Sequence, residues 1–104
     1  MIIREGTKMA TVYKVKNCFL LKRIAGEYIV IARGNKALEF NGTLVLNESC
    51  AVVWEKLKSF VSITEIASEL VSVFGIEYEI ACRDVEACID KMACFDLLDI
   101  KEQV

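Results

Sequence analysis

Five cysteines, a pair of neighbouring carboxylates and one serine are the side chains whose chemistry could define a function for this chain. Histidine, the commonest general base and a frequent metal ligand, is absent. The cysteines form no C-x-x-C pair and are odd in number, so their pattern indicates neither a zinc site nor a complete set of disulfides. We therefore expect buried or half-buried free thiols in a reducing compartment. The five are Cys18, Cys50, Cys82, Cys88 and Cys94.

The positions that resemble catalytic groups lack partners that would activate them. Glu86 and Asp90 are spaced i, i+4 on an acidic helix face, where carboxylates are ordinarily solvated. Ser49 lies at a predicted helix start without the glycines of a nucleophile elbow. Cys50 in the first turn would have a lowered thiol pKa if exposed, but its place in the apolar pattern favours burial. We expect no enzyme and no cofactor, with a thiol or redox enzyme as an alternative.

A strand that leads directly into a helix is the unit around which the chain is organised. Residues 43–46 are β-branched or aliphatic and follow the turn signal Asn41-Gly42, which is typical of a strand. Asn47 is placed as the helix N-cap, and the apolar residues that follow have helical spacing. These apolar residues are Cys50, Val53, Trp54, Leu57 and Val61, so Trp54 is expected in the core rather than at a binding surface.

The remaining elements complete a small α+β domain. Residues 19–24 and 28–32 flank Gly26 and predict a hairpin, and residues 11–15 alternate as an extra strand would. Ser62 and Glu65 form a capping box for a second helix that ends at Gly75. The third helix spans residues 79–94, with Val85, Ile89 and Met92 as its core stripe, and Leu97, Leu98 and Ile100 are expected to pack the tail onto the core. The pattern predicts a three-stranded antiparallel meander followed by three helices, similar to a winged helix-turn-helix.

The predicted third strand, residues 43–46, lies at the rim of this meander. It contains no proline or lysine, although such residues are a common means by which proteins protect an exposed edge. We therefore expect either another part of the chain or a binding partner to cover it.

Length, hydropathy and charge narrow the class of protein further. The 104 residues suffice for one core, and neither a membrane span nor a signal peptide is visible, so a cytoplasmic protein is expected. Residues 1–36 are basic and residues 77–99 are acidic. A winged-helix DNA-binding regulator is the alternative function, but its groove-reading helix would be the acidic one, which makes nucleic acid an unfavourable partner.

The sequence resembles the PqqD family, whose name refers to protein D of pyrroloquinoline quinone biosynthesis. The resemblance covers about residues 18–100, and the order and spacing of its pieces carry it. The pieces are residues 19–30, Phe40-Asn41-Gly42, Leu46-Asn47-Glu48, residues 53–57, Asp84-Val85 and Leu97-Leu98. Asp96 stands where many relatives have glycine, and because aspartate tolerates the left-handed conformation we expect that turn to be preserved.

The resemblance implies a recognition element for ribosomally made, modified peptides. Residues 18–104 would form the peptide-recognition domain, and residues 1–17 an N-terminal extension. The leader segment of a precursor peptide would add as a strand to residues 43–46 and be presented to a modifying enzyme, often a radical S-adenosylmethionine (SAM) enzyme. The same edge could instead pair with a second copy in a homodimer. The implied binding residues are Thr43, Leu44, Val45, Leu46, Arg83, Asp84, Ala87, Cys88 and Lys91, with Arg83 available to a leader carboxylate.

Overall fold

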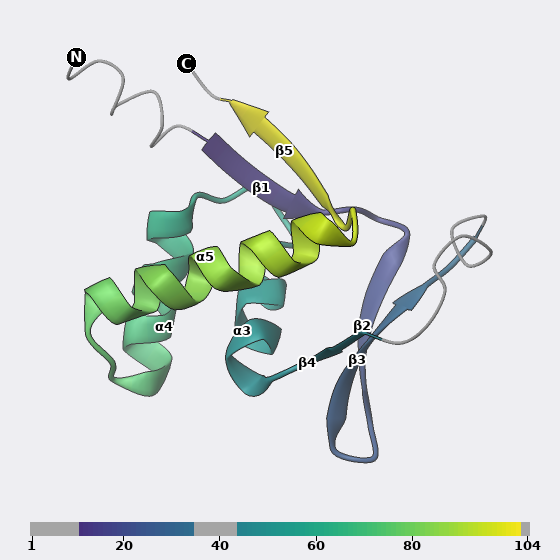
Figure 1. The fold of residues 1–104 in the computed structure, drawn as a ribbon, viewed down its shortest axis with the longest axis horizontal. Helices are drawn as coiled ribbons and strands as arrows, with labels where there is room; N and C mark the ends of the chain where they lie inside the picture. The colour runs from purple at the N-terminus through teal and green to yellow at the C-terminus, as the bar shows by residue number, and fades with distance from the viewer. Residues whose placement is uncertain (1–10, 35–43, 103–104) are drawn as a thin grey trace.

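The computed structural model describes residues 11–34 and 44–102. Its strands form two antiparallel sheets, a three-stranded sheet in the order β2-β3-β4 and a two-stranded sheet of β1 and β5 (Figure 1). The elements are β1 (Thr11–Val15), β2 (Phe19–Ile24), β3 (Glu27–Ala32), β4 (Leu44–Leu46), α3 (Glu48–Lys56), α4 (Ile63–Phe74), α5 (Tyr78–Cys94) and β5 (Leu98–Glu102). The predicted fold, a three-stranded meander followed by three helices, is confirmed.

The hairpin of β2 and β3 is closed by Ala25 and Gly26, both of which have positive φ. Such a two-residue turn matches the right-handed twist of the paired strands. β4 pairs antiparallel with β3, with Leu46 opposite Tyr28 and Leu44 opposite Val30. One face of the sheet packs on the helices, and alternate residues of its strands are buried or partly buried there. The buried residues of this face include Phe19, Val30, Leu44 and Leu46.

The helix boundaries follow the predicted capping residues. Asn47 accepts a hydrogen bond from the backbone N–H of Cys50 at 2.8 Å, which orients the start of α3 directly after β4. Ser62 and Glu65 form the predicted capping box at the start of α4, and Gly75 ends that helix with a φ of 68°. Trp54 is only 2% exposed, so the prediction that it is a core residue is confirmed.

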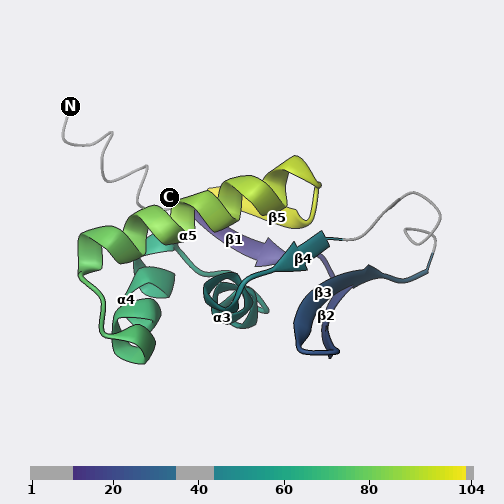
Figure 2. The same ribbon diagram turned by 60° about the horizontal axis from the view of Figure 1, so that its bottom comes forward.

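The long helix α5 lies across α3 and α4 (Figures 1 and 2). Its predicted core stripe of Val85, Ile89 and Met92 is buried, as expected. After the helix, Asp96 has a φ of 59°, so the left-handed turn is preserved without glycine. None of the described helices is both long and apolar enough to cross a membrane.

The extra strand predicted at residues 11–15 is present as β1, and it pairs with β5. Val15, Leu97 and Leu98 are buried, so the tail returns to the core as expected up to Leu98. Ile100 does not follow this prediction, since it is 55% exposed. Within β5 only the first residue, Leu98, is buried. The division between an extension of residues 1–17 and a recognition domain of residues 18–104 stays a prediction, and it falls between β1 and β2.

Candidate functional site

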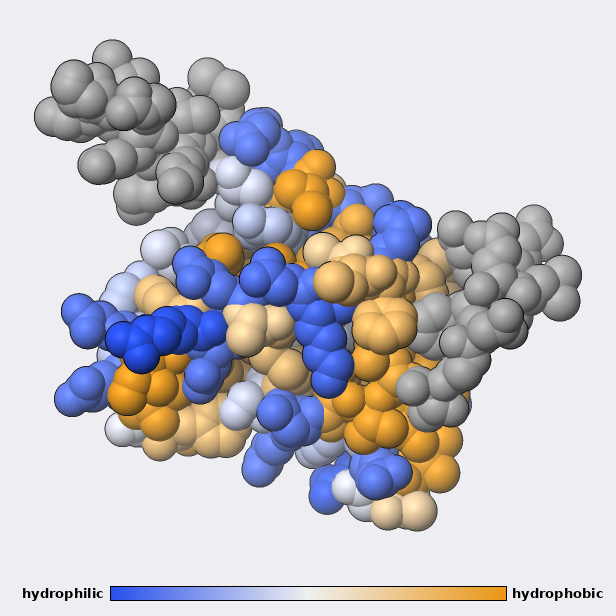
Figure 3. All heavy atoms as spheres, in the orientation of Figure 1, coloured by the Kyte–Doolittle hydropathy of each residue, from blue (hydrophilic) through white to orange (hydrophobic). Residues whose placement is uncertain are grey.

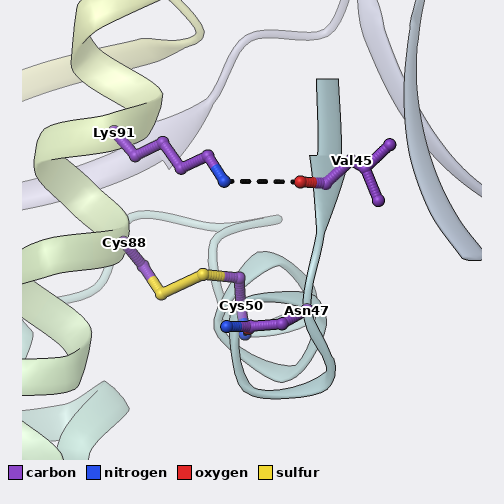
Figure 4. The surroundings of a disulfide bond; sticks show 5 residues. All are labelled: Val45, Asn47, Cys50, Cys88 and Lys91. Atoms are coloured by element: carbon purple, nitrogen blue, oxygen red, sulfur yellow. Dashed lines mark hydrogen bonds between the residues drawn. A yellow bond between two sulfur atoms is a disulfide. The ribbon is translucent and has the colours of Figure 1, made fainter. Parts of the chain in front are cut away.

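The free edge of β4 is the feature from which the candidate site is built. Among the described strands β4 pairs only with β3, so its opposite edge is unpaired. The Val45 carbonyl accepts a hydrogen bond from the Lys91 ammonium at 3.3 Å, across this edge (Figure 4). Because the N–H and C=O of one residue in an antiparallel strand point to the same side, the Val45 N–H also faces the free edge. Val45 therefore presents one donor and one acceptor to a ligand.

The side chains of β4 alternate between the core and the surface. Leu44 is 5% and Leu46 is 2% exposed, whereas Val45 is 40% exposed. The described residues of the predicted binding strand therefore differ, since Leu44 and Leu46 support it from the core and, of these three, only Val45 has an accessible side chain. Thr43, the fourth predicted residue of this strand, lies outside the described residues.

The other outer strands carry charges that β4 lacks. β2 contains Lys22 and Arg23, and β5 contains Asp99, Lys101 and Glu102. Charged side chains discourage a second chain from pairing with an edge. β4 reads Leu-Val-Leu, and apolar surface gathers in Figure 3 over the part of the molecule where Figure 1 places β2, β3 and β4. Among the outer strands of the described sheets, β4 is thus the one without a charged side chain.

Helix α5 supplies the second wall, and the predicted wall residues differ in how they meet β4. Lys91 is exposed and contacts the Val45 carbonyl directly. Asp84 is half-buried and lies almost two turns earlier on the same row of the helix. Ala87 is exposed beside this row. Arg83 is also exposed, and it makes no hydrogen bond or ion pair with β4 within the described parts of the chain.

Cys88 is not available as a free groove residue. It is buried and forms a disulfide with Cys50, with a Cα–Cα distance of 5.8 Å (Figure 4). The expectation that all five thiols are free is therefore wrong for this pair, although Cys18 and Cys82 are half-buried free thiols and Cys94 is an exposed one. The error arose because the partners lie 38 residues apart, on different helices. Both occupy core-facing helical positions, and that signal alone does not select them from the other cysteines.

The disulfide connects the two walls of the candidate groove. Cys50 lies in the first turn of α3, which follows β4 after the single residue Asn47, and Cys88 lies one turn before Lys91 on α5. A covalent bond at this point restrains the distance between β4 and the facing helix. A hollow of about 390 Å³ lies near the end of β4, between the β2–β3 hairpin and the start of α3, and α5 does not line it. Its lining includes Tyr28, Val45, Asn47 and Glu48.

A larger hollow of about 460 Å³ lies on the other side of α5, between that helix, β1 and the start of α4. It contains the carboxylates Glu86 and Asp90 together with Tyr13. Burial raises the pKa of the Tyr13 phenol, and the charges of Glu102, Asp90 and Glu86 raise it further. The phenol thus stays protonated at neutral pH and is a poor general base. We place the candidate site at β4, because unpaired backbone groups are available there.

Comparison with models of protein families assigns the chain to one family. Residues 21–97 match the model of the PqqD family, described as coenzyme PQQ synthesis protein D. The chain therefore belongs to the PqqD family, as the resemblance implied. Comparison with curated proteins gives no match.

Three solved structures share the fold at 16% sequence identity. Lasso peptide synthetase B1 complexed with the leader peptide has a TM-score of 0.65 and covers 84% of this chain and 96% of its own. TbiB1 in complex with the TbiA(beta) leader peptide has a TM-score of 0.66, with coverage of 83% and 94%. The third is the solution structure of the PqqD truncation of Methylobacterium extorquens PqqCD, described as a functional, stand-alone RiPP recognition element. Its TM-score is 0.67, and the match covers 85% of this chain and 88% of that one.

Proposed function

We propose that this protein is a non-catalytic module that binds the leader segment of a ribosomally made precursor peptide as an added strand on β4. It then presents the precursor to a modifying enzyme such as a radical SAM protein. The observation that carries the proposal is the uncharged free edge of β4, with the Val45 backbone directed toward α5. Membership of the PqqD family supports it, as does the likeness to two solved structures that contain leader peptides.

The two walls contribute in different ways. The Val45 N–H and C=O offer two backbone hydrogen bonds, which together contribute about 1–3 kcal/mol. Micromolar affinity corresponds to about 8 kcal/mol. Side-chain contacts with Val45 and with the α5 row of Asp84, Ala87 and Lys91 must therefore supply most of the binding free energy. This is the usual division in strand addition, where backbone bonds align the peptide and side chains select it.

The residues that resemble catalytic groups have other surroundings in the fold. Cys50 is bonded to Cys88 and has no free thiol. Glu86 and Asp90 lie beside Tyr13, whose raised pKa keeps its proton on the phenol. These environments support a binding role without chemistry of its own.

A titration of the 15N-labelled protein with the leader of the precursor peptide encoded beside its gene tests the proposal. The amide signals of Val45 and of residues 84–91 should shift, while those of β5 should stay in place. Shifts confined to β5 would reject the groove. Duplex DNA in a parallel titration should leave all signals unchanged at low salt, because α5 exposes Glu79, Glu86 and Asp90.

Substitution of Val45 separates its backbone from its side chain. Val45→Pro removes the N–H on the free edge while leaving the bonds between β4 and β3 in place, since these involve Leu44 and Leu46. Val45→Ala is the matched control, because it shortens the side chain and keeps the N–H. We expect Val45→Pro to weaken leader binding at least tenfold and Val45→Ala to weaken it less. Equal effects of the two variants would contradict strand addition.

A further inference from the structure

The Lys91 ammonium is hydrogen-bonded to the Val45 carbonyl, which is the backbone acceptor that a guest strand would need. Its ammonium lies 3.3 Å from the Val45 oxygen, on the unpaired side of β4 (Figure 4). A guest strand would lie about 4.7–4.9 Å from β4, and its N–H nitrogen would approach the same oxygen to about 2.9 Å. The ammonium and the guest N–H would thus lie side by side at one carbonyl oxygen, which has two lone pairs. A guest strand on this edge therefore runs next to the Lys91 head group, and the flexible four-carbon stem of the lysine lets the head group adjust to it.

The Lys91 ammonium forms no ion pair with a carboxylate among the described residues. The ion pairs among the described residues are Lys16–Asp96, Lys56–Glu69 and Lys58–Glu55, and none includes Lys91. Asp84 lies seven residues earlier on α5, about 10 Å along the helix axis, which is too far for direct pairing. Cys88, between them on the same side, is held in the disulfide and carries no charge.

From this geometry we propose that Lys91 is a specificity-determining residue that selects leaders with an aspartate or glutamate facing α5. The inference rests on the proposed function and names the chemistry of its ligand. A docked peptide would cover the ammonium and exclude water from it, which is unfavourable for an unpaired charge. A carboxylate on the guest strand would pair with it. Because side chains alternate along a strand, the acidic residue must be one of those that point toward α5.

Leader variants and a neutral Lys91 variant together test this assignment. Each Asp and Glu of the leader encoded beside the gene is changed in turn to Asn or Gln, and its dissociation constant is measured with the native protein and with Lys91→Met. Methionine keeps an unbranched side chain and removes the charge. For one acidic position, amide substitution should weaken binding to the native protein about tenfold and should not weaken binding to Lys91→Met. Lys58→Met, which removes an exposed cation outside the candidate groove, should retain the full discrimination.

Each outcome distinguishes the specificity assignment from the proposed function. If every leader variant affects the native protein and Lys91→Met equally, Lys91 does not select the acid, although the groove still binds the leader. If the unmodified leader does not bind the native protein at all, the proposed function fails first. Preferential binding of Lys91→Met to the Gln or Asn leader would strengthen the assignment, because that complex contains no uncompensated charge.

Discussion

The two sheets of this protein differ in how their outer edges are occupied (Figure 2). In the two-stranded sheet, the edge of β1 that faces away from β5 is bonded to the segment between α3 and α4. The Tyr13 N–H donates to the Val61 carbonyl at 2.8 Å and its own carbonyl accepts from the Val61 N–H at 3.0 Å. Val15 donates to the Leu57 carbonyl at 2.8 Å. In the three-stranded sheet, β4 has no such partner strand among the described residues, and one lysine head group approaches it.

This difference indicates which edge a guest peptide can use. Free edges are a hazard for a soluble chain, and the fold protects most of its edges by main-chain bonds or by charges. β1 is closed by Leu57 and Val61, and β2 and β5 carry lysine, arginine or acidic residues. An apolar edge that is left open beside a helix is costly unless it binds something. The contrast between the edges of β1 and β4 therefore leads to three predictions.

Loss of the disulfide should have the largest effect. A Cys50→Ala and Cys88→Ala double variant should lower the free energy of unfolding by about 2–4 kcal/mol in urea denaturation, because the cross-link restricts the unfolded chain. It should also weaken leader binding, since α5 is no longer tied to the start of α3. The β1–β5 sheet lies outside this link, so its hydrogen-exchange protection should decrease only with global stability. Cys94→Ala, at an exposed free cysteine, is the control and should leave both measurements unchanged.

Proline substitution on the two edges should affect folding differently. Tyr13→Pro removes the N–H that bonds to Val61, leaves the Val61 carbonyl without its donor and should destabilise the fold by about 1–3 kcal/mol. The comparison is best made with Tyr13→Ala as the control for the lost ring. Val45→Pro should cost less than about 1 kcal/mol in the free protein, because no described strand pairs with the Val45 N–H. A larger stability loss for Val45→Pro than for Tyr13→Pro would show that the β4 edge is closed in solution.

Alkaline pH should produce the smallest effect, and part of it should arise on the β1 side of the molecule, at Tyr13. The pKa of Tyr13 is raised in the folded state by burial and by Glu102, Asp90 and Glu86. The folded protein then holds this proton more tightly than the unfolded chain, whose tyrosine titrates near the ordinary value of about 10. The resulting stability is fully present below about pH 10 and is lost as pH rises through the higher folded pKa. Tyr13→Phe should remove this part of the decline in unfolding free energy, whereas Tyr28→Phe should retain it.

Local signals predicted most of the elements. The Asn47 cap, the Ser62 and Glu65 capping box and the core stripe of α5 each depend on residues within a few positions of one another, so they are visible in the sequence. The turn at Asp96 was predicted differently, from the glycine that many PqqD relatives have at this position and the tolerance of aspartate for the left-handed conformation. The open edge of β4 followed from the order of strands in a meander.

The details of the candidate groove required the tertiary structure. All four residues of 43–46 were predicted to line it, but the packing of the sheet on the helices turns Leu44 and Leu46 into the core and leaves Val45 outside. The predicted wall of α5 included Cys88, which the fold instead brings to Cys50. No local pattern shows that Lys91 reaches the Val45 carbonyl, because these residues lie 46 positions apart.

The sequence by itself determined the class of fold, the helix starts and the presence of an uncharged strand at the rim, because capping and periodicity act over short stretches of chain. It did not determine the end of α3, which was expected near residue 59 but lies at Lys56, because Val61 pairs with Tyr13 of β1. Only the tertiary structure decided that the outer edge of β1 is bonded to Leu57 and Val61, which cysteines form the disulfide, and which backbone groups of β4 face α5. Those features arise from contacts between distant segments, whose distances and directions are established only when the whole core packs.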